Sequence, residues 1–302
     1  MTVRLRRSEL AVPGSQEKMI LKSAETEADL VFLDLEDAVA PAQKESARAR
    51  VIDALRDIDW GRKTRAVRMN SVDTVWSHDD VIDVVSKAGA QLDIIIVPKV
   101  KAPRDVWFVE TLLLQLESKL RLGKQIGIEV LIEETEALAR VEEIAGCSPR
   151  LEALILGVGD LSASQGIRMG NVSDPALRYP GDMWHYARNR MIVAARANKI
   201  DAIDGPYPNY RDGGGYRREA TWGATLGAAG KWCIHPSQIE IANDVFAPTQ
   251  KEIEVAKRMC DAYAASQTAG DGAVGESGML VDAASVRIFE GVLERARLTG
   301  RM

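Results

Sequence analysis

The sequence predicts an α/β protein folded as a (β/α)8 TIM barrel with a C-terminal helical extension. Short apolar segments alternate with longer segments of helical periodicity, about eight times over roughly 235 residues. Residues 94–97 are apolar throughout, as expected for a strand that is covered on both faces of a parallel sheet. An open doubly wound sheet is the runner-up, but that fold often carries a glycine-rich phosphate turn after its first strand. Here only a generic turn, with Pro13 and Gly14, follows the first strand.

Eight apolar segments are the predicted strands. They are residues 10–12, 30–35, 65–69, 94–97, 126–132, 154–156, 202–203 and 231–234. The predicted helices between them carry apolar residues three and four positions apart, most clearly in residues 106–120. The other predicted helices are residues 43–55, 135–145, 183–197 and 215–227.

The pattern changes at about Ala247. Residues 248–265 have helical character, a glycine-rich stretch covers residues 270–279, and residues 283–297 form a last amphipathic segment. We therefore expect a catalytic barrel in residues 1–246 and an extension in residues 247–302. The extension could be a lid, an oligomerisation arm, or only a linker with a packing helix.

Composition excludes several classes of protein. The chain has 302 residues, 46% of them apolar and 27% charged, which is typical of a folded globular protein. Its net charge of −5 argues against a nucleic-acid partner. No apolar run approaches the ~18 residues of a membrane span, and no signal core follows the basic N-terminus. Cys147, Cys233 and Cys260 have neither disulfide nor zinc spacing, which favours a cytoplasmic protein.

In a barrel of this kind, functional side chains lie where the strands end. The polar residues that follow the predicted strands are Asp34, Glu36, Asp37, Arg68, Asn70, Lys99, Glu133, Glu134, Asp160, Asp204 and His235. Glu133 and Asp160 follow adjacent strands and are the preferred ligands of a divalent cation such as Mg²⁺, which takes one or two carboxylates and keeps positions for water and substrate. Asp160 could instead only cap the next helix.

Two cationic residues admit alternative roles. Arg68 could bind a carboxylate or stabilise a developing oxyanion, or it could form a structural ion pair with Glu36 or Asp37. These two acids could orient metal-bound waters. Lys99 could form a Schiff base with a carbonyl substrate, but an acid-rich mouth would keep it protonated, which favours an ion pair.

A small basic group surrounds the first predicted strand. Lys18 and Lys22 lie one helical turn apart after it, and Arg4, Arg6 and Arg7 precede it. In an acidic protein, such a group could hold a phosphorylated part of a substrate. It could also be no more than a solvated surface.

Seven stretches of the chain together resemble the HpcH/HpaI aldolase and citrate lyase β-like family, and within it the malyl-CoA and β-methylmalyl-CoA lyases. They are RSELAVPGS (7–15), LDLEDAVAP (33–41), VRMN (67–70), VPKV (97–100), EVLIE (129–133), LGVGDLSAS (156–164) and GKWCIHPSQI (230–239). Two features depart from the family pattern. Ala11 stands where members often have an aromatic residue, and residues 169–183 form a shorter segment than typical malyl-CoA lyases have, so the preferred acyl group stays open.

The resemblance implies a metal-dependent carbon–carbon lyase. Such an enzyme reversibly cleaves a 3-hydroxyacyl-CoA, such as L-malyl-CoA or β-methylmalyl-CoA, to acetyl-CoA or propionyl-CoA plus glyoxylate. It also implies a homotrimer or homohexamer in which the extension contributes to a neighbouring subunit's site. The alternatives are a citramalyl-CoA lyase, which releases pyruvate, a malyl-CoA thioesterase, or a non-catalytic acyl-CoA-binding protein on the same scaffold.

The resemblance also implies roles for particular residues. Glu133 and Asp160 would hold Mg²⁺ or Mn²⁺, and Asp282 would be the catalytic acid/base. The other implied site residues are Arg68, Glu36 and Asp37 for catalysis, Lys18 and Lys22 at the phosphates of coenzyme A, and the backbone of Ile234 and His235 along the acyl-CoA channel. From the sequence alone, Asp282 could instead only cap the helix that begins near Ala283.

Overall fold

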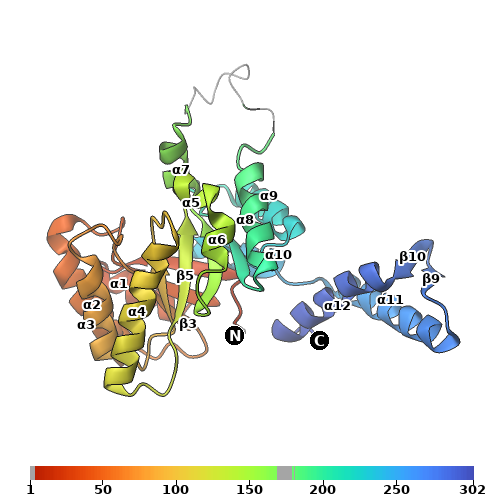
Figure 1. The fold of residues 1–302 in the computed structure, drawn as a ribbon, viewed down its shortest axis with the longest axis horizontal. Helices are drawn as coiled ribbons and strands as arrows, with labels where there is room; N and C mark the ends of the chain where they lie inside the picture. The colour runs from red at the N-terminus through yellow and green to blue at the C-terminus, as the bar shows by residue number, and fades with distance from the viewer. Residues whose placement is uncertain (1–3, 169–178, 180) are drawn as a thin grey trace. The chain divides into compact units, whose positions relative to one another are not determined.

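The computed structural model describes residues 4–168, 179 and 181–302 (Figure 1). It divides into two compact units, Met1–Ala242 and Asn243–Met302. The division falls within helix α10 (Ile239–Val245), a few residues before the expected boundary after residue 246. Most of the segment 169–183, which the sequence analysis singles out, lies outside the described residues.

In the first unit, eight parallel strands close into a barrel in sequence order, with β1 paired to β8. The strands are β1 (Ser8–Pro13), β2 (Leu30–Asp34), β3 (Thr64–Arg68), β4 (Ile94–Val97), β5 (Gly127–Ile132), β6 (Leu151–Leu156), β7 (Asp201–Asp204) and β8 (Gly230–Cys233). The predicted (β/α)8 barrel is confirmed. Each predicted strand is present, and its ends differ from the prediction by at most three residues.

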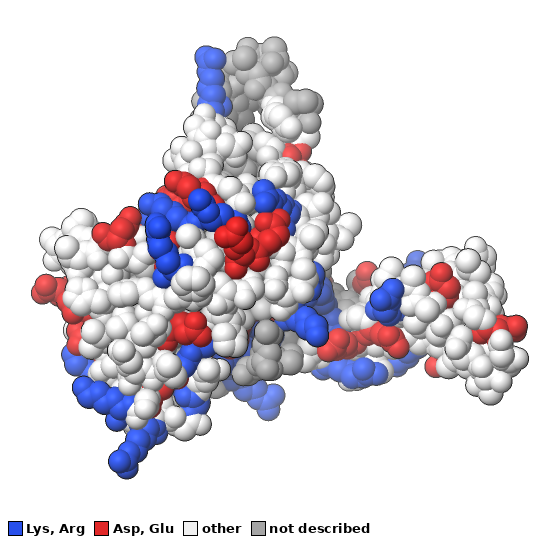
Figure 2. Space-filling view, viewed as in Figure 1, with Lys and Arg blue, Asp and Glu red and all other residues white. Residues whose placement is uncertain are grey.

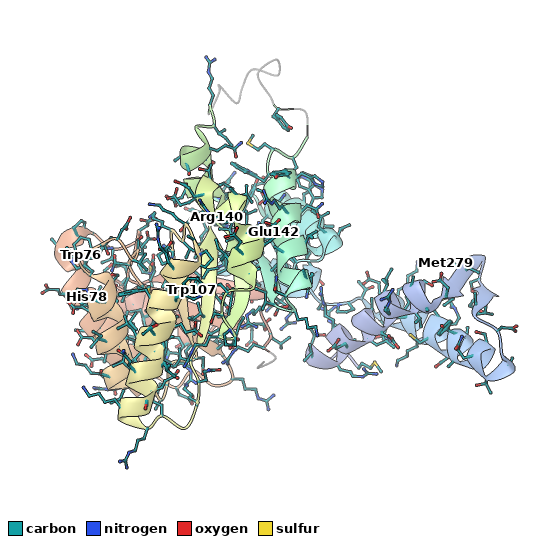
Figure 3. All side chains as sticks on the ribbon, in the orientation of Figure 1. Trp76, His78, Trp107, Arg140, Glu142 and Met279 are labelled. Atoms are coloured by element: carbon teal, nitrogen blue, oxygen red, sulfur yellow. The ribbon has the colours of Figure 1, made fainter. Side chains whose placement is uncertain are left out.

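Helices surround this barrel. They are α1 (Glu17–Ala24), α2 (Lys44–Asp57), α3 (Ser77–Ala88), α4 (Pro103–Leu120), α5 (Thr135–Ala139), α6 (Val141–Ala145), α7 (Val158–Gln165), α8 (His185–Ala197) and α9 (Gly213–Leu226), followed by α10. The predicted helix 135–145 is interrupted at Arg140, between α5 and α6 (Figure 3). Within the described part of the chain, no helix is long and apolar enough to cross a membrane.

The barrel interior is a packed core. Each strand alternates between residues that face the barrel axis and residues that face the helices, so both faces are covered. The inward-facing apolar residues are Leu30, Phe32, Ala66, Ile94, Ile96, Leu131, Ala153, Ile155, Ile203 and Trp232. This double burial explains why residues 94–97 are apolar at every position.

Ion pairs close the amino-terminal end of the barrel. The Arg6 guanidinium is buried and donates from Nε to Glu129 Oε1 at 2.8 Å, and it also binds Glu152. Arg4 donates to the same Glu152, and Arg7 binds Asp29 with two of its nitrogens. The three arginines of the expected basic group are therefore bound to acids at this end, and the idea that they help hold a phosphorylated substrate is wrong.

The second unit is a helical hairpin that carries a short sheet. It consists of α11 (Gln250–Ala269), β9 (Ala273–Glu276), β10 (Met279–Asp282) and α12 (Ala283–Leu298). Strands β9 and β10 pair antiparallel across a turn in which Ser277 and Gly278 have φ of 51° and 79°. Positive φ at both central residues is the requirement of a tight type I′ hairpin turn. The glycine-rich stretch is therefore largely an ordered hairpin rather than a loose linker.

Candidate functional site

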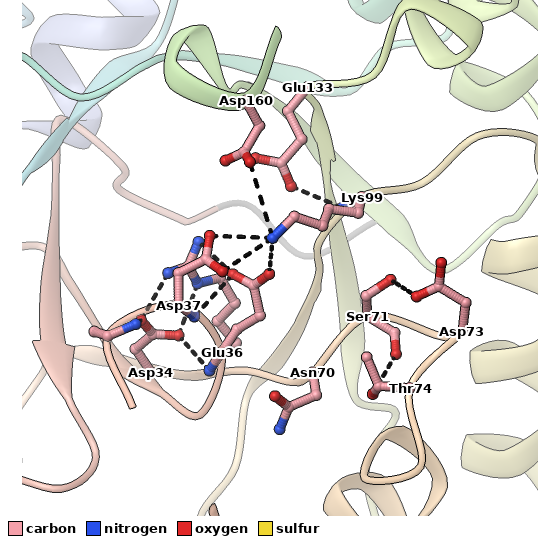
Figure 4. Close-up of polar contacts among 12 residues, drawn as sticks. Asp34, Glu36, Asp37, Asn70, Ser71, Asp73, Thr74, Lys99, Glu133 and Asp160 are labelled. Atoms are coloured by element: carbon pink, nitrogen blue, oxygen red, sulfur yellow. Dashed lines mark hydrogen bonds and ion pairs between the residues drawn. The ribbon is translucent and has the colours of Figure 1, made fainter. Parts of the chain in front are cut away.

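A cluster of charged side chains gathers where strands β2 to β6 end (Figure 4). Asp34 ends β2 and Arg68 ends β3, while Lys99 follows β4. Glu133 follows β5, and Asp160 lies in the first turn of α7, after β6. Because the carboxyl ends of parallel strands meet at one end of a barrel, residues far apart in the sequence converge here, as the sequence analysis expects.

The Arg68 guanidinium is almost fully buried and bound on two sides. Its Nε and Nη2 donate to the two carboxylate oxygens of Asp34 at 2.8 and 2.6 Å, and its Nη1 lies 3.1 Å from Glu36 Oε2. Asp34 is itself fixed by the backbone N–H groups of Glu36 and Ala38. Burial alone would lower the pKa of Arg68, but the Asp34 and Glu36 carboxylates raise it overall, so the guanidinium stays charged.

Lys99 links two parts of the cluster. Its backbone has φ of 51°, the left-handed region, and its N–H donates to Glu133 Oε1 at 2.7 Å. Its ammonium group binds Glu36 and lies 3.0 and 3.1 Å from the two oxygens of Asp37, and 3.9 Å from Asp160 Oδ1. Burial lowers the pKa of Lys99, but its hydrogen bonds to Glu36 and Asp37 raise it well above the usual value. Schiff-base chemistry needs a neutral amine, so this geometry favours the ion pair.

The two acids beside Lys99 differ in their titration. Burial raises the pKa of the Glu36 carboxyl despite the opposing charges of Arg68 and Lys99. Burial would also raise the pKa of Asp37, but the hydrogen bond from Lys99 outweighs it and holds the pKa below the ordinary value. Asp37 is therefore ionised at neutral pH and compensates the Lys99 charge.

Glu133 and Asp160 fit the donor set of a hard divalent cation. Glu133 lies against Gly157, where a Cβ would approach the Glu133 Cβ to 2.4 Å and its Oε2 to 2.6 Å, so this position admits only glycine. Burial raises the pKa of the Glu133 carboxyl to about 8, and the negative charges of Asp160 and Glu36 contribute to the rise. A bound cation would favour the ionised form and reverse this shift.

The donor set is limited to two carboxylates. Among the residues that the structure describes, no group of three or more His, Cys, Asp or Glu side chains could hold a metal ion. Glu133 Oε1 accepts the Lys99 N–H, which leaves Oε2 as the free oxygen, and the Asp160 side chain is 42% exposed. Mg²⁺ is often bound by one or two carboxylates, with water and substrate filling the other positions.

The residues expected to contact coenzyme A also follow barrel strands. Lys18 and Lys22 are exposed on α1, which follows β1. Ile234, which is 39% exposed, and His235 come directly after β8. The His235 ring stacks on Tyr210 with ring centroids 4.8 Å apart, and its Nδ1 accepts the backbone N–H of Ser237. On the face of the first unit that Figure 2 shows, acidic and basic side chains are interspersed and do not form separate acidic and basic patches.

Asp282 lies in the second unit, where it caps α12. Its Oδ1 accepts hydrogen bonds from the backbone N–H groups of Ala284 and Ser285 at 3.0 and 2.8 Å. The Ser285 hydroxyl in turn accepts from the Asp282 N–H, which completes a reciprocal cap. The hydrogen bonds from Ser285 lower the pKa of the Asp282 carboxyl. Capping uses Oδ1, so it does not engage Oδ2.

Sequence reasoning missed Trp232 as a neighbour of the site. Its ring lies beneath Arg68, with the guanidinium carbon 5.5 Å from the ring centroid. The signal was present in the strand alternation, because Trp232 is an inward-facing residue of β8. An aromatic ring at the axis of a barrel is ordinary core, so the alternation alone assigns it no role.

The closed barrel and its charged carboxyl-terminal mouth define the protein as an enzyme of the (β/α)8 class. The chain belongs to the HpcH/HpaI aldolase/citrate lyase family, whose model matches residues 7–236. The resemblance seen in the sequence is thereby confirmed.

Several characterised proteins are similar to this chain. An L-malyl-CoA/β-methylmalyl-CoA lyase from Cereibacter sphaeroides is 38% identical over 301 residues, which cover 97% of this chain and 95% of the relative. A (3S)-malyl-CoA thioesterase from the same species is 34% identical over 276 residues, covering 91% of this chain and 89% of the relative. The solved structure of CitE from Mycobacterium tuberculosis, in complex with magnesium, acetoacetate and coenzyme A, is 27% identical with a TM-score of 0.75, covering 96% of this chain and 97% of that one.

Proposed function

We propose that this protein is a metal-dependent carbon–carbon lyase that reversibly cleaves a 3-hydroxyacyl-CoA, such as L-malyl-CoA or β-methylmalyl-CoA. The products are acetyl-CoA or propionyl-CoA and glyoxylate. The observation that carries the proposal is that buried Arg68, which binds Asp34, lies at the same barrel mouth as the Glu133 and Asp160 carboxylates, close enough for the charges of Arg68 and Asp160 to act on Glu133. The similarity to the Cereibacter lyase over nearly the whole chain supports this choice of reaction.

Glu133 and Asp160 would hold Mg²⁺ or Mn²⁺. When bound, such an ion supplies Lewis-acid polarisation of the 2-oxo acid oxygens. The magnesium in the related CitE complex supports this assignment. Glu36 and Asp37, which Lys99 and Arg68 hold in place, would orient water at the mouth.

Arg68 would hold the oxygens of the 2-oxo acid. Cleavage of the carbon–carbon bond leaves negative charge on the thioester enolate, and a buried guanidinium is suited to share charge that develops in its site. In cleavage the hydroxyl proton of the substrate would pass to water at the mouth as the carbonyl of the 2-oxo acid forms, and Asp282 would give a proton to the α-carbon of the nascent acyl-CoA; in condensation Asp282 would remove that proton again. The capping bonds to Oδ1 favour the ionised carboxylate, which is the form that removes the proton in condensation, and Oδ2 is the oxygen outside the cap.

The remaining parts of the proposal concern coenzyme A and the assembly. Lys18 and Lys22 would contact its phosphates, and the backbone of Ile234 and His235 would line the acyl-CoA channel. We further propose a homotrimer or homohexamer, in which residues 247–302 bring Asp282 to a neighbouring subunit's mouth. A cytoplasmic location is supported by the three cysteines, which are all free.

Product analysis tests the reaction. The protein is incubated separately with malyl-CoA, β-methylmalyl-CoA and citramalyl-CoA in the presence of Mg²⁺, and 2-oxo acid and free thiol are both measured. A lyase releases glyoxylate or pyruvate in amounts equal to the acyl-CoA formed, without thiol, and a chelator abolishes the reaction. Release of thiol would instead identify a thioesterase, as in the 34% identical relative. Activity that survives the chelator would refute the metal-dependent mechanism.

A further inference from the structure

A fully buried carboxylate lies below the candidate site, inside the barrel. Glu9 comes from β1, and its side chain is inaccessible to solvent. Its Oε2 accepts a hydrogen bond from Trp232 Nε1 at 2.9 Å. For its Oε1, the described part of the protein offers no hydrogen-bond partner. Burying an acid in this way is unfavourable, so an apolar residue of similar size would stabilise the core more.

Glu9 holds the indole ring of Trp232 at one edge. The ring also packs against Phe32, with centroids 4.5 Å apart and an interplanar angle of 36°. With Phe32 at the ring and Glu9 at the N–H, the indole has one orientation in the barrel. Burial and the nearby Glu129 charge raise the pKa of Glu9, and an acid in either protonation state still accepts the indole N–H.

The same ring supports Arg68 from below. The guanidinium carbon lies 5.5 Å from the ring centroid, within the range of a cation–π contact. Asp34 fixes the edge of the guanidinium through Nε and Nη2. The bonds to Asp34 therefore set the direction in which the guanidinium points. The contact with the Trp232 ring sets its height along the barrel axis.

We propose that Glu9 is a positioning residue that acts through Trp232 to set the place of Arg68 at the barrel mouth. This inference rests on the proposed function, in which Arg68 holds the 2-oxo acid. Glu9 itself touches no substrate, because Trp232 lies between it and Arg68. The carboxylate is retained in the core because it accepts the indole N–H, which no apolar side chain can do.

Three substitutions separate this role from simple packing. Glu9→Met removes the acceptor and keeps the bulk, whereas Glu9→Gln keeps an acceptor oxygen. Trp232→Phe keeps an aromatic ring and removes the N–H, so it tests the same link if Glu9→Met does not fold. Ile94→Val is the matched control, because it removes one methyl group from the same interior cluster and leaves the Glu9 carboxylate, the Trp232 indole and the Arg68 guanidinium unchanged.

The experiment combines kinetics with the NMR signals of the six tryptophan indole groups. Trp232→Phe identifies the Trp232 signal by its loss. We expect Glu9→Met and Arg68→Ala each to shift that signal. Glu9→Met should also lower kcat about tenfold or more, because small misplacement of a catalytic group is costly, while KM for the acyl-CoA changes less than twofold. Glu9→Gln should recover most of kcat, and Ile94→Val should change neither measurement.

Several outcomes would overturn the inference. The first is an unchanged kcat in Glu9→Met although the Trp232 indole signal shifts. The second is a loss of kcat that is equally large in Glu9→Gln and in Glu9→Met. If the wild-type protein turns over none of the substrates, the proposed function fails, and the NMR measurement still decides the positioning role. In that case a Trp232 signal that does not move in Arg68→Ala would refute the coupling.

Discussion

Replacing Arg68 with lysine tests whether this side chain serves chemistry or only structure. Arginine has five N–H donors in a planar fork. Three of them are engaged: Nε and one N–H of Nη2 with Asp34, and one N–H of Nη1 with Glu36. Two donors, one on each terminal nitrogen, remain for a substrate. Lysine keeps the positive charge, but it cannot hold Asp34 with two parallel bonds and also present two donors.

The expected loss follows from those two donors. A hydrogen bond between charged groups contributes about 1.5 to 3 kcal/mol, so two contribute about 3 to 6 kcal/mol. The ammonium group of lysine replaces part of this, which leaves a loss of about 2 to 4 kcal/mol. At about 1.36 kcal/mol for each factor of ten, kcat/KM should fall about 30- to 900-fold.

The assay is steady-state cleavage of malyl-CoA, and the structure offers a matched control on the same strand. Arg65 also binds an aspartate with two nitrogens, Nε and Nη2 to Asp93 at 2.9 and 3.2 Å, but at the start of β3. Arg65→Lys should therefore lower the melting temperature without a comparable loss of activity. If Arg68→Lys retains wild-type kcat/KM, or if both variants lose activity equally, Arg68 is a structural ion pair.

The remaining predictions concern the carboxylates. Glu133→Gln and Asp160→Asn should each weaken Mg²⁺ binding in calorimetric titration and abolish activity; unchanged affinity in both would remove them as ligands. Because the pKa of Glu133 is raised to about 8 in the folded state, against about 4.3 in an unfolded chain, the folded protein binds this proton more tightly. In chelator, the free energy of unfolding should therefore fall as pH rises between these two pKa values, and it should fall less steeply in Glu133→Gln. Equal pH slopes of the free energy of unfolding in the two proteins would contradict this. Asp282→Asn should lose activity but keep a folded second unit, since asparagine also caps helices, whereas Asp282→Ala should lose about 0.5 to 2 kcal/mol of stability as well. Mixed oligomers of Asp282→Asn and Arg68→Ala protomers should partly recover activity, and no recovery would show that Asp282 does not act across an interface.

The barrel was predictable because its signals are local. Strand β4 is apolar at each position, and residues 106–120 carry the helical spacing that α4 shows. Helix α3 carries the same kind of signal, with apolar residues at Val81, Val84, Val85 and Ala88, but it is not among the predicted helices. The hairpin β9–β10 was hidden because its turn residues, which include glycine, also suit a flexible linker.

Pairing between distant residues was the part that sequence could not supply. The acids after β2 were recognised as candidates, but which oxygen meets Arg68 depends on the register of β2 against β3. Arg6 looked like a free cation, and its partners lie more than a hundred residues away, at Glu129 and Glu152. Local patterns determine which side chains are present at a strand end. The closure of the barrel determines which of them become partners.

The ion pairs at the amino-terminal end of the barrel bear on the order in which ligands come and go. The ion pairs of Arg6 with Glu129 and Glu152 close that end. Phe32 and Trp232 fill the interior, so ligands reach Arg68 from the carboxyl-terminal end of the barrel. A 2-oxo acid on Arg68 would then lie deeper than the acyl-CoA that follows it. In condensation the 2-oxo acid would bind first. In cleavage it would leave last, after the acyl-CoA has dissociated from the barrel mouth. A barrel that is closed at its amino-terminal end and open only at its carboxyl-terminal end therefore leads to an ordered sequential mechanism.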